Sequence, residues 1–101
     1  MHDNSILEVA IFTLKAGFHG DMPELRRGLR SALRAFPGLV EFHGYSPLQD
    51  ERYFADIARW DSLEHAQAAA TAFAQGDPRF APYMHAIEEL VFMGHFHADI
   101  A

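Results

Sequence analysis

The segment at residues 6–14, ILEVAIFTL, constrains the fold most, because it is apolar on both sides of an extended chain. Successive side chains of a strand point to opposite faces. The apolar side chains of one face are Leu7, Val9 and Ile11, and those of the other are Ile6, Ala10 and Phe12. Residues 52–60 repeat the pattern, with Tyr53, Ala55 and Ile57 against Phe54, Ala58 and Trp60. Strands of this kind need cover on both faces.

The remaining segments complete the order βαββαβ. The predicted elements are a strand at 6–14, a helix between Asp21 and Pro37, strands at 39–48 and 52–60, a helix between Asp61 and Gln75, a short helix at 79–86 and a strand at 87–97. Asp21 and Asp61 are expected to cap the two longer helices, because each is followed three residues later by a glutamate.

This order predicts one α+β domain over residues 1–101 with a ferredoxin-like fold, a four-stranded antiparallel sheet with two helices on one face. Right-handed crossovers place the first and third strands side by side at its centre. Two helices cover only one face, so the other would leave several hundred Å² of apolar surface exposed, more than a monomer usually shows. We therefore expect a homodimer, in which two sheets meet face to face as an eight-stranded α/β barrel.

Composition excludes several classes of protein. The 101 residues contain no cysteine, which removes disulfide scaffolds and thiolate metal sites. A net charge of −6 argues against a nucleic-acid partner, which usually demands a basic surplus. No apolar run is long enough to span a membrane, and the first residues, MHDNS, lack the form of a signal peptide. We expect a cytoplasmic protein without nucleic-acid or membrane partners.

Three segments carry a resemblance to a known family: LKAGF after the first strand, PGLVEFHGY at the second, and ARWDSLEHAQAA at the end of the third. Together with the element order, they resemble the antibiotic biosynthesis monooxygenase family of the dimeric α/β-barrel superfamily, over about residues 6–97. The resemblance implies a pocket between sheet and helices that takes a small apolar or aromatic ligand. It also implies oxygenase chemistry on aromatic or quinol-like molecules without a cofactor or metal.

Heme-degrading relatives of that family pair the third-strand tryptophan with a first-strand asparagine and a histidine in the second helical region. Trp60 matches the tryptophan, but Ala10 stands near the asparagine position. No histidine follows Trp60 at the expected distance, since the available ones are His65 and His85. This departure counts against heme degradation.

Glu8 and Asp56 are the candidate acids. Alternation places Glu8 with Ala10 and Phe12, and Asp56 with Trp60, so both carboxylates line the Trp60 side if those two faces coincide. In a dry pocket, either carboxylate could have a raised pKa and take a proton from a phenol or quinol. Asp56 is the candidate catalytic residue of the two. The alternative is that both are solvated or paired with Arg52 or Arg59.

Other candidates lie on the same predicted pocket. Trp60 could stack on a flat substrate or simply close the core, and Phe12 would line the pocket beside it. Tyr83 could orient a substrate oxygen or serve as a core residue. His85 is the second candidate catalytic residue, because its pKa suits proton transfer or an axial contact with heme. Its alternative is a hydrogen-bonded helix residue.

His95 and His97 lie two apart on one strand and so point to one side, where His43 could add a third metal ligand. With seven histidines in the chain, chance pairs are common. The arginines at 26, 30 and 34 form a helical stripe that could attract an acidic partner or remain solvated. Three functions follow: a cofactor-independent monooxygenase, a non-catalytic ligand-binding or stress-related barrel, and a heme-binding protein using His85.

Overall fold

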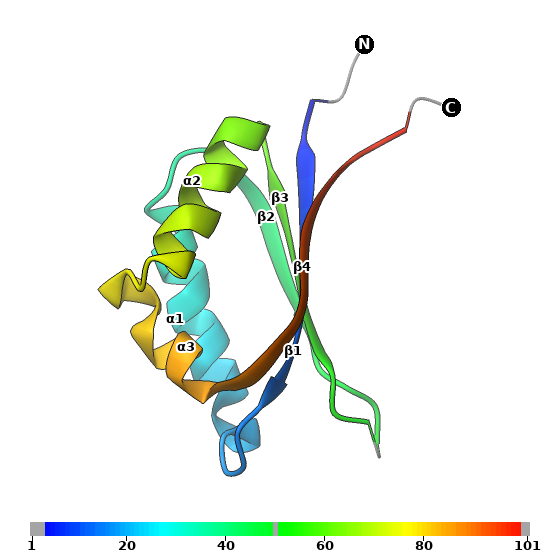
Figure 1. Ribbon diagram of the computed structural model, residues 1–101, viewed down its shortest axis with the longest axis vertical. Helices are drawn as coiled ribbons and strands as arrows, with labels where there is room; N and C mark the ends of the chain where they lie inside the picture. Colours follow the sequence, from blue (N-terminus) through cyan, green and yellow to red (C-terminus); the bar gives the residue numbers. More distant parts are fainter. Residues whose placement is uncertain (1–3, 50, 100–101) are drawn as a thin grey trace.

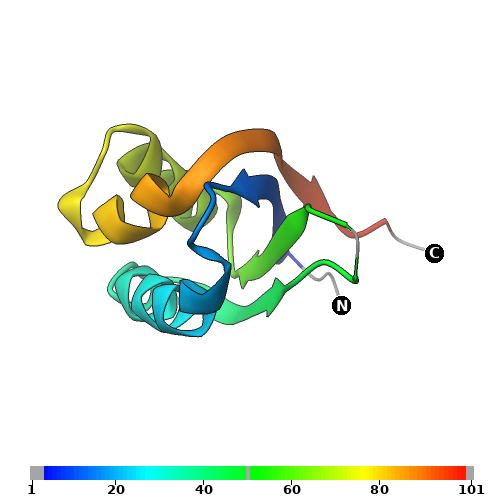
Figure 2. The ribbon, with the colours of Figure 1, turned by 90° about the horizontal axis from the view of Figure 1, so that it is seen from below.

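The computed structural model describes residues 4–49 and 51–99. Its elements are β1 (Ile6–Leu14), η1 (His19–Asp21), α1 (Met22–Arg34), β2 (Leu39–Tyr45), β3 (Phe54–Trp60), α2 (Leu63–Ala74), η2 (Pro78–Phe80), α3 (Ala81–Ala86) and β4 (Ile87–His97). The predicted βαββαβ order is confirmed. Figure 1 shows the helices on one side of the sheet, and Figure 2 shows the same layers from below.

The four strands form one antiparallel sheet in the order β2-β3-β1-β4, with β1 and β3 at its centre as predicted. Glu8 pairs with Ala58 and Ala10 pairs with Asp56. Because paired residues point to the same face of an antiparallel sheet, this register places Glu8 and Asp56 on one side. The strands predicted at 39–48 and 52–60 are shorter than expected.

The helix α1 packs its apolar stripe on the sheet through Leu29, Ala32 and Leu33, which are buried. Asp21 is the N-cap residue of α1, as predicted, but the expected side-chain cap does not form. The turn η1 holds Asp21 in a helical conformation, and its side chain makes no capping hydrogen bond. Gly38 follows the helix with φ +96°, in a region that favours glycine.

The second helix begins one residue later than predicted. The extended Ser62 is its N-cap, and its hydroxyl accepts a hydrogen bond from the backbone N–H of His65. Asp61, the expected cap, instead contacts the His65 ring, with Oδ1 2.6 Å from Nδ1. Small side chains let α2 approach the sheet closely, since Ala66 and Ala69 are both buried.

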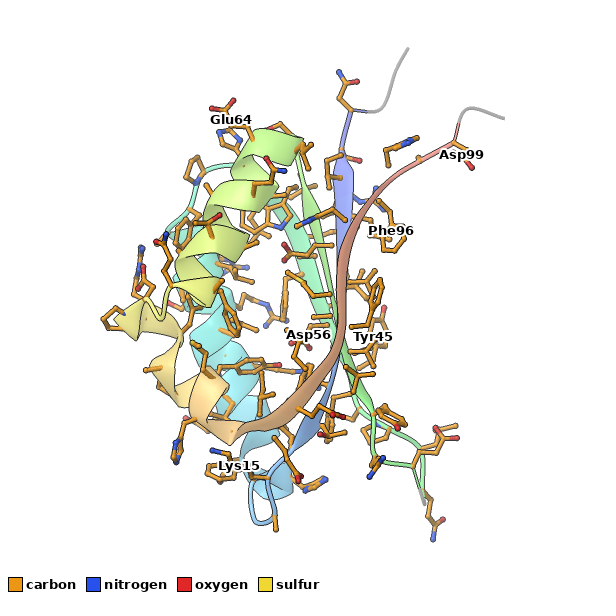
Figure 3. The ribbon with its side chains drawn as sticks, viewed as in Figure 1. Lys15, Tyr45, Asp56, Glu64, Phe96 and Asp99 are labelled. Carbon is orange, nitrogen blue, oxygen red and sulfur yellow. The ribbon has the colours of Figure 1, made fainter. Side chains whose placement is uncertain are left out.

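The two faces of the sheet differ sharply. The helix-covered face holds the core, with Trp60, Phe12 and Phe80 as its most deeply buried large side chains. On the other face, called here the open face, lie Leu7, Val9, Ile11, Ile57, Tyr45, Phe92 and Phe96. Figure 3 shows Asp56 on the helix side and Tyr45 and Phe96 on the opposite side.

A bulge in β4 changes one assignment from the sequence. Simple alternation places Leu90 with Phe92 and Phe96, but the register shifts between Ile11 and Phe12 on the neighbouring strand. Leu90 therefore pairs with Phe12 and joins the helix side. Gly94 lies between the two stacked phenylalanines, where a Cβ would come within 2.7 Å of the Phe92 ring.

In the described residues, no helix is both long and apolar enough to cross a membrane.

Candidate functional site

A cavity of about 390 Å³ lies between the sheet and the helices. Both the sheet and the helices contribute to its apolar wall. The apolar residues of the wall are Ala10, Leu29, Leu33, Phe42, Ala58, Ala69, Ala70, Phe73, Ala74, Phe80, Met84, Ile87, Leu90 and Met93. Among residues 4–49 and 51–99, the polar side chains that line it are Glu8, Asp56, Tyr83 and His95. Small-molecule sites have this character, with an apolar lining and a few polar groups that fix orientation.

Asp56 lies at the centre of the first polar cluster. The Tyr83 hydroxyl donates a short hydrogen bond to its Oδ2, and the Arg26 Nε donates to Oδ1 at 3.2 Å. Burial raises the pKa of the Asp56 carboxyl above its ordinary value, although Tyr83 and Arg26 favour the charged form. Burial and the neighbouring carboxylate also raise the pKa of the Tyr83 hydroxyl, so it remains a donor.

Gly44 gives Arg26 its access to this carboxylate. Gly44 pairs with Asp56 across β2 and β3, and a Cβ at this position would overlap the Arg26 Nε. The guanidinium of Arg26 extends past Gly44. Its Nη1 donates a hydrogen bond to the Ser46 hydroxyl, and its Nη2 donates one to the carbonyl of Tyr45 at 2.8 Å. Arg26 therefore joins α1 to two strands, rather than belonging to a solvated stripe.

Glu8 and His95 form the second polar cluster, on β1 and β4. The His95 Nε2 lies 2.7 Å from the Glu8 Oε2. Burial raises the pKa of the Glu8 carboxyl, against the opposing effects of His95 and the Trp60 indole. The buried Trp60 Nε1 lies near this carboxylate but outside hydrogen-bond geometry, and it has no partner among residues 4–49 and 51–99.

The structure brings together three of the predicted site residues in this cavity, namely Glu8, Asp56 and Tyr83. The expected pairing of Asp56 with Arg52 or Arg59 is wrong. Arg59 instead donates to Glu41 on the open face, with Nε 2.9 Å from Oε1, and Arg52 contacts Tyr53.

The other three predicted residues do not line the cavity. Trp60 and Phe12 are fully buried in the core next to it, where Phe12 contacts the Tyr83 ring edge-on at 5.7 Å. His85 is exposed and packs against Phe18, with ring centroids 5.7 Å apart. Tyr83 and His85 are two residues apart on α3, and residues at this spacing do not share a helix face. His85 therefore lies outside this cavity in the structure.

The three histidines considered as metal ligands, His43, His95 and His97, do not all converge within the described part of this chain. His95 lies on the helix side of β4, whereas His43 lies on the open face of β2, at the opposite sheet edge. In the part of the chain that the structure describes, no group of three potential ligands converges.

Sequence reasoning did not identify three residues of the site. Arg26 contacts Asp56 from outside the cavity wall, and in the sequence only the glycine at 44 distinguishes it from the other arginines of its stripe. His95 lines the cavity, and the sequence gives no sign of this because nothing local sets the register of β4 against β1. Phe73 shows helical periodicity with the core, and this signal does not separate a cavity wall from a filled core.

The fold places this chain in a class of small ferredoxin-like proteins that enclose a pocket between sheet and helices. No protein-family profile matches the sequence, and no curated protein matches it. Solved structures do match over nearly the full length. A proposed antibiotic biosynthesis monooxygenase from Bordetella bronchiseptica has a TM-score of 0.78 at 11% identity, over 96% of this chain and 99% of that chain.

Two further structures are similar. SnoaB, a cofactor-independent oxygenase from Streptomyces nogalater, has a TM-score of 0.68 at 19% identity, over 97% of this chain and 96% of its own. A proposed antibiotic biosynthesis monooxygenase from Chloroflexus aurantiacus has a TM-score of 0.71 at 14% identity, over 96% and 95%. These matches confirm the fold implied by the family resemblance. At 11%, 19% and 14% identity, these matches show the fold and not the substrate or the activity.

Proposed function

We propose that this protein is a cofactor-independent monooxygenase that acts on an aromatic or quinol-like small molecule. One observation carries the proposal: an apolar cavity of about 390 Å³ holds two separate clusters of buried polar groups. The volume lies in the range of small-molecule sites, roughly 300–1,000 Å³. The fold shared with SnoaB, a cofactor-independent oxygenase, supports this assignment.

The proposed reaction begins when a group on the cavity wall takes a proton from the substrate. The electron pair stays on the ring system, and the resulting anion passes electrons to O₂, forming a carbon–oxygen bond as a hydroperoxide. Loss of water then leaves a ketone. A CH₂ group and O₂ thus become C=O and H₂O, so the substrate supplies all the electrons.

The Asp56 cluster is suited to holding a substrate oxygen. The Tyr83 O–H donates a hydrogen bond to Asp56, so the Tyr83 oxygen remains able to accept a hydrogen bond from a substrate hydroxyl. Both Asp56 oxygens already accept hydrogen bonds, from Arg26 and from Tyr83. Asp56 therefore fits a positioning role better than the proton-accepting role expected from the sequence.

The hydrogen bonds that Arg26 and Tyr83 donate to Asp56 also favour a second function, capture of an apolar ligand without turnover. Such a network stabilises a binding site as readily as a catalytic one. Incubation with anthrone under ¹⁸O₂ separates the two functions. The oxygenase incorporates one ¹⁸O atom into the ketone product, whereas the binding protein retains anthrone unchanged.

A matched pair of variants ties that activity to the cavity. Ala70→Trp fills the cavity from α2, while Ala68→Trp adds the same ring to the exposed face of that helix. We expect Ala70→Trp alone to abolish anthrone oxidation. Oxidation that survives in Ala70→Trp would show that the reaction occurs elsewhere.

We also propose that the protein acts as a homodimer. The open face presents Phe92 and Phe96 with 44% and 47% of their surfaces exposed, and Tyr45 with 55%. Apolar burial contributes about 25 cal/mol per Å², so covering this face favours association. A second copy of the sheet offers the same apolar surface in return.

A further inference from the structure

Glu8 and His95 form a second polar pair on the cavity wall, and the positioning role of Asp56 does not account for it. The register places Glu8 on β1 directly opposite His95 on β4, on the helix side of the sheet. Their side chains are only 13% and 23% exposed, and both line the cavity. The pair is held by the sheet itself, which gives the imidazole a fixed position relative to a bound molecule.

The cavity that the pair lines has a largely apolar wall. Helix α2 contributes Ala69, Ala70, Phe73 and Ala74 to this wall, and β4 contributes Met93. Asp56 and Tyr83 are the other titratable groups on the cavity wall. His97 lies on the same face of β4 but outside the cavity, where its Nδ1 contacts the carbonyl of Ala98.

The hydrogen-bond pattern distinguishes His95 from Asp56. The Nε2 of His95 is hydrogen-bonded to the Glu8 carboxylate, and its Nδ1 has no hydrogen-bond partner among the described residues. A carboxylate on one ring nitrogen fixes the tautomer and leaves the other nitrogen able to accept a proton. On Asp56, by contrast, each carboxylate oxygen already accepts a hydrogen bond from a protein side chain.

We propose that His95 is the catalytic base of the oxygenase described above and that Glu8 is its positioning residue. This inference rests on the proposed function. A substrate phenol gives its proton to Nδ1 of His95, and the electron pair of the broken O–H bond stays on oxygen as a phenolate. The Nε2–H remains hydrogen-bonded to Glu8, whose negative charge stabilises the imidazolium. This step consumes no oxidant.

The test uses 4-nitrophenol under anaerobic conditions, because its phenolate is coloured and its ionisation is read without turnover. The bound probe is titrated with pH in the wild type, His95→Gln, Asp56→Asn and the control His97→Gln. The glutamine at 95 can still donate to Glu8 but cannot take a proton. We expect His95→Gln to lower the ratio of bound phenolate to phenol about tenfold, a shift of one pH unit.

Glu8→Gln is expected to shift the same titration in the same direction, because the neutral amide no longer stabilises an imidazolium. Added imidazole should restore phenolate formation in His95→Ala, which a purely structural role would not permit. His97→Gln should match the wild type.

The outcomes separate this inference from the proposed function. Phenolate formation that depends on Asp56 and survives His95→Gln would overturn the role of His95 alone, and so would an equal effect of His97→Gln. Failure of 4-nitrophenol to bind the wild-type cavity would remove both proposals. Binding that weakens in His95→Gln with unchanged ionisation would make His95 a contact residue and reject it as the base.

Discussion

Arg26 and Asp56 are thirty residues apart in sequence, yet they form an ion pair that fastens α1 to the middle of the sheet. The two side chains are only 13% and 8% exposed. Removing one partner of a buried pair leaves the other charge uncompensated, which costs about 3–5 kcal/mol. The pair therefore supports both stability and the shape of the cavity.

Replacing Arg26 with methionine should lower the free energy of unfolding at neutral pH by about 3 kcal/mol, because Asp56 is left charged and buried. Arg27→Met is the matched control on the next residue, where an exposed pair with Glu24 contributes little. Urea unfolding of both variants checks this. Similar losses in the two would mean that solvent reaches Asp56 freely.

Glu8 and Glu41 should affect the pH dependence of the stability in opposite directions. Burial raises the pKa of Glu8, so the folded chain holds this proton to higher pH than the unfolded chain does. As pH rises from 4.5 to the raised value, the folded state loses stability relative to the unfolded state. Glu8→Gln lacks this ionisation, so its stability relative to the wild type should rise across that window.

Glu41 provides the opposite case. Hydrogen bonds from Arg59 and His43 lower the pKa of its exposed carboxyl. The wild type should therefore gain stability relative to Glu41→Gln as pH rises toward 4.5. Chemical unfolding of both variants, from below pH 4.5 to neutrality, measures the two slopes. Slopes of the same sign would contradict the burial of Glu8.

Phe73 should matter more to a ligand than Trp60 does. Phe73 lines the cavity, so Phe73→Ala should weaken anthrone binding about tenfold. Trp60 is fully buried outside the cavity wall, so Trp60→Ala should cost about 3–5 kcal/mol of stability instead. Fluorescence titration at matched stability compares them. A larger affinity loss in Trp60→Ala would place the indole against the ligand.

The open face predicts the oligomeric state. Phe92→Glu should convert the expected dimer to a monomer in sedimentation velocity experiments, because it buries a charge in the proposed interface. Leu48→Glu is the control, since Leu48 is 77% exposed in the segment after β2. A wild-type protein that sediments as a monomer at micromolar concentration would rule out the dimer.

Much of the architecture could be predicted because the alternation in β3 is strict. Asp56, Ala58 and Trp60 occupy every second position, and all three are buried on the helix side as expected. The element order followed from similar local patterns. Alternation places Leu90 on the wrong face because the bulge in β4 leaves no mark in the local sequence.

The site itself was less accessible to sequence reasoning. Its two polar clusters join segments far apart in the chain, and no short turn sets their register. Glu8 meets His95 only because β1 lies beside β4 in a particular alignment. His85 lies outside the cavity for a simpler reason, which is that the two-residue spacing on α3 turns it away from Tyr83.

Gly44 also has an evolutionary consequence. Because a side chain at this position would occupy the space of the Arg26 guanidinium, residues 26 and 44 are expected to change together. Divergent sequences of this fold that carry alanine or larger at 44 should lack the arginine at 26 and have a neutral residue in place of Asp56. A glycine at position 44 would then mark which related sequences retain a charged cavity.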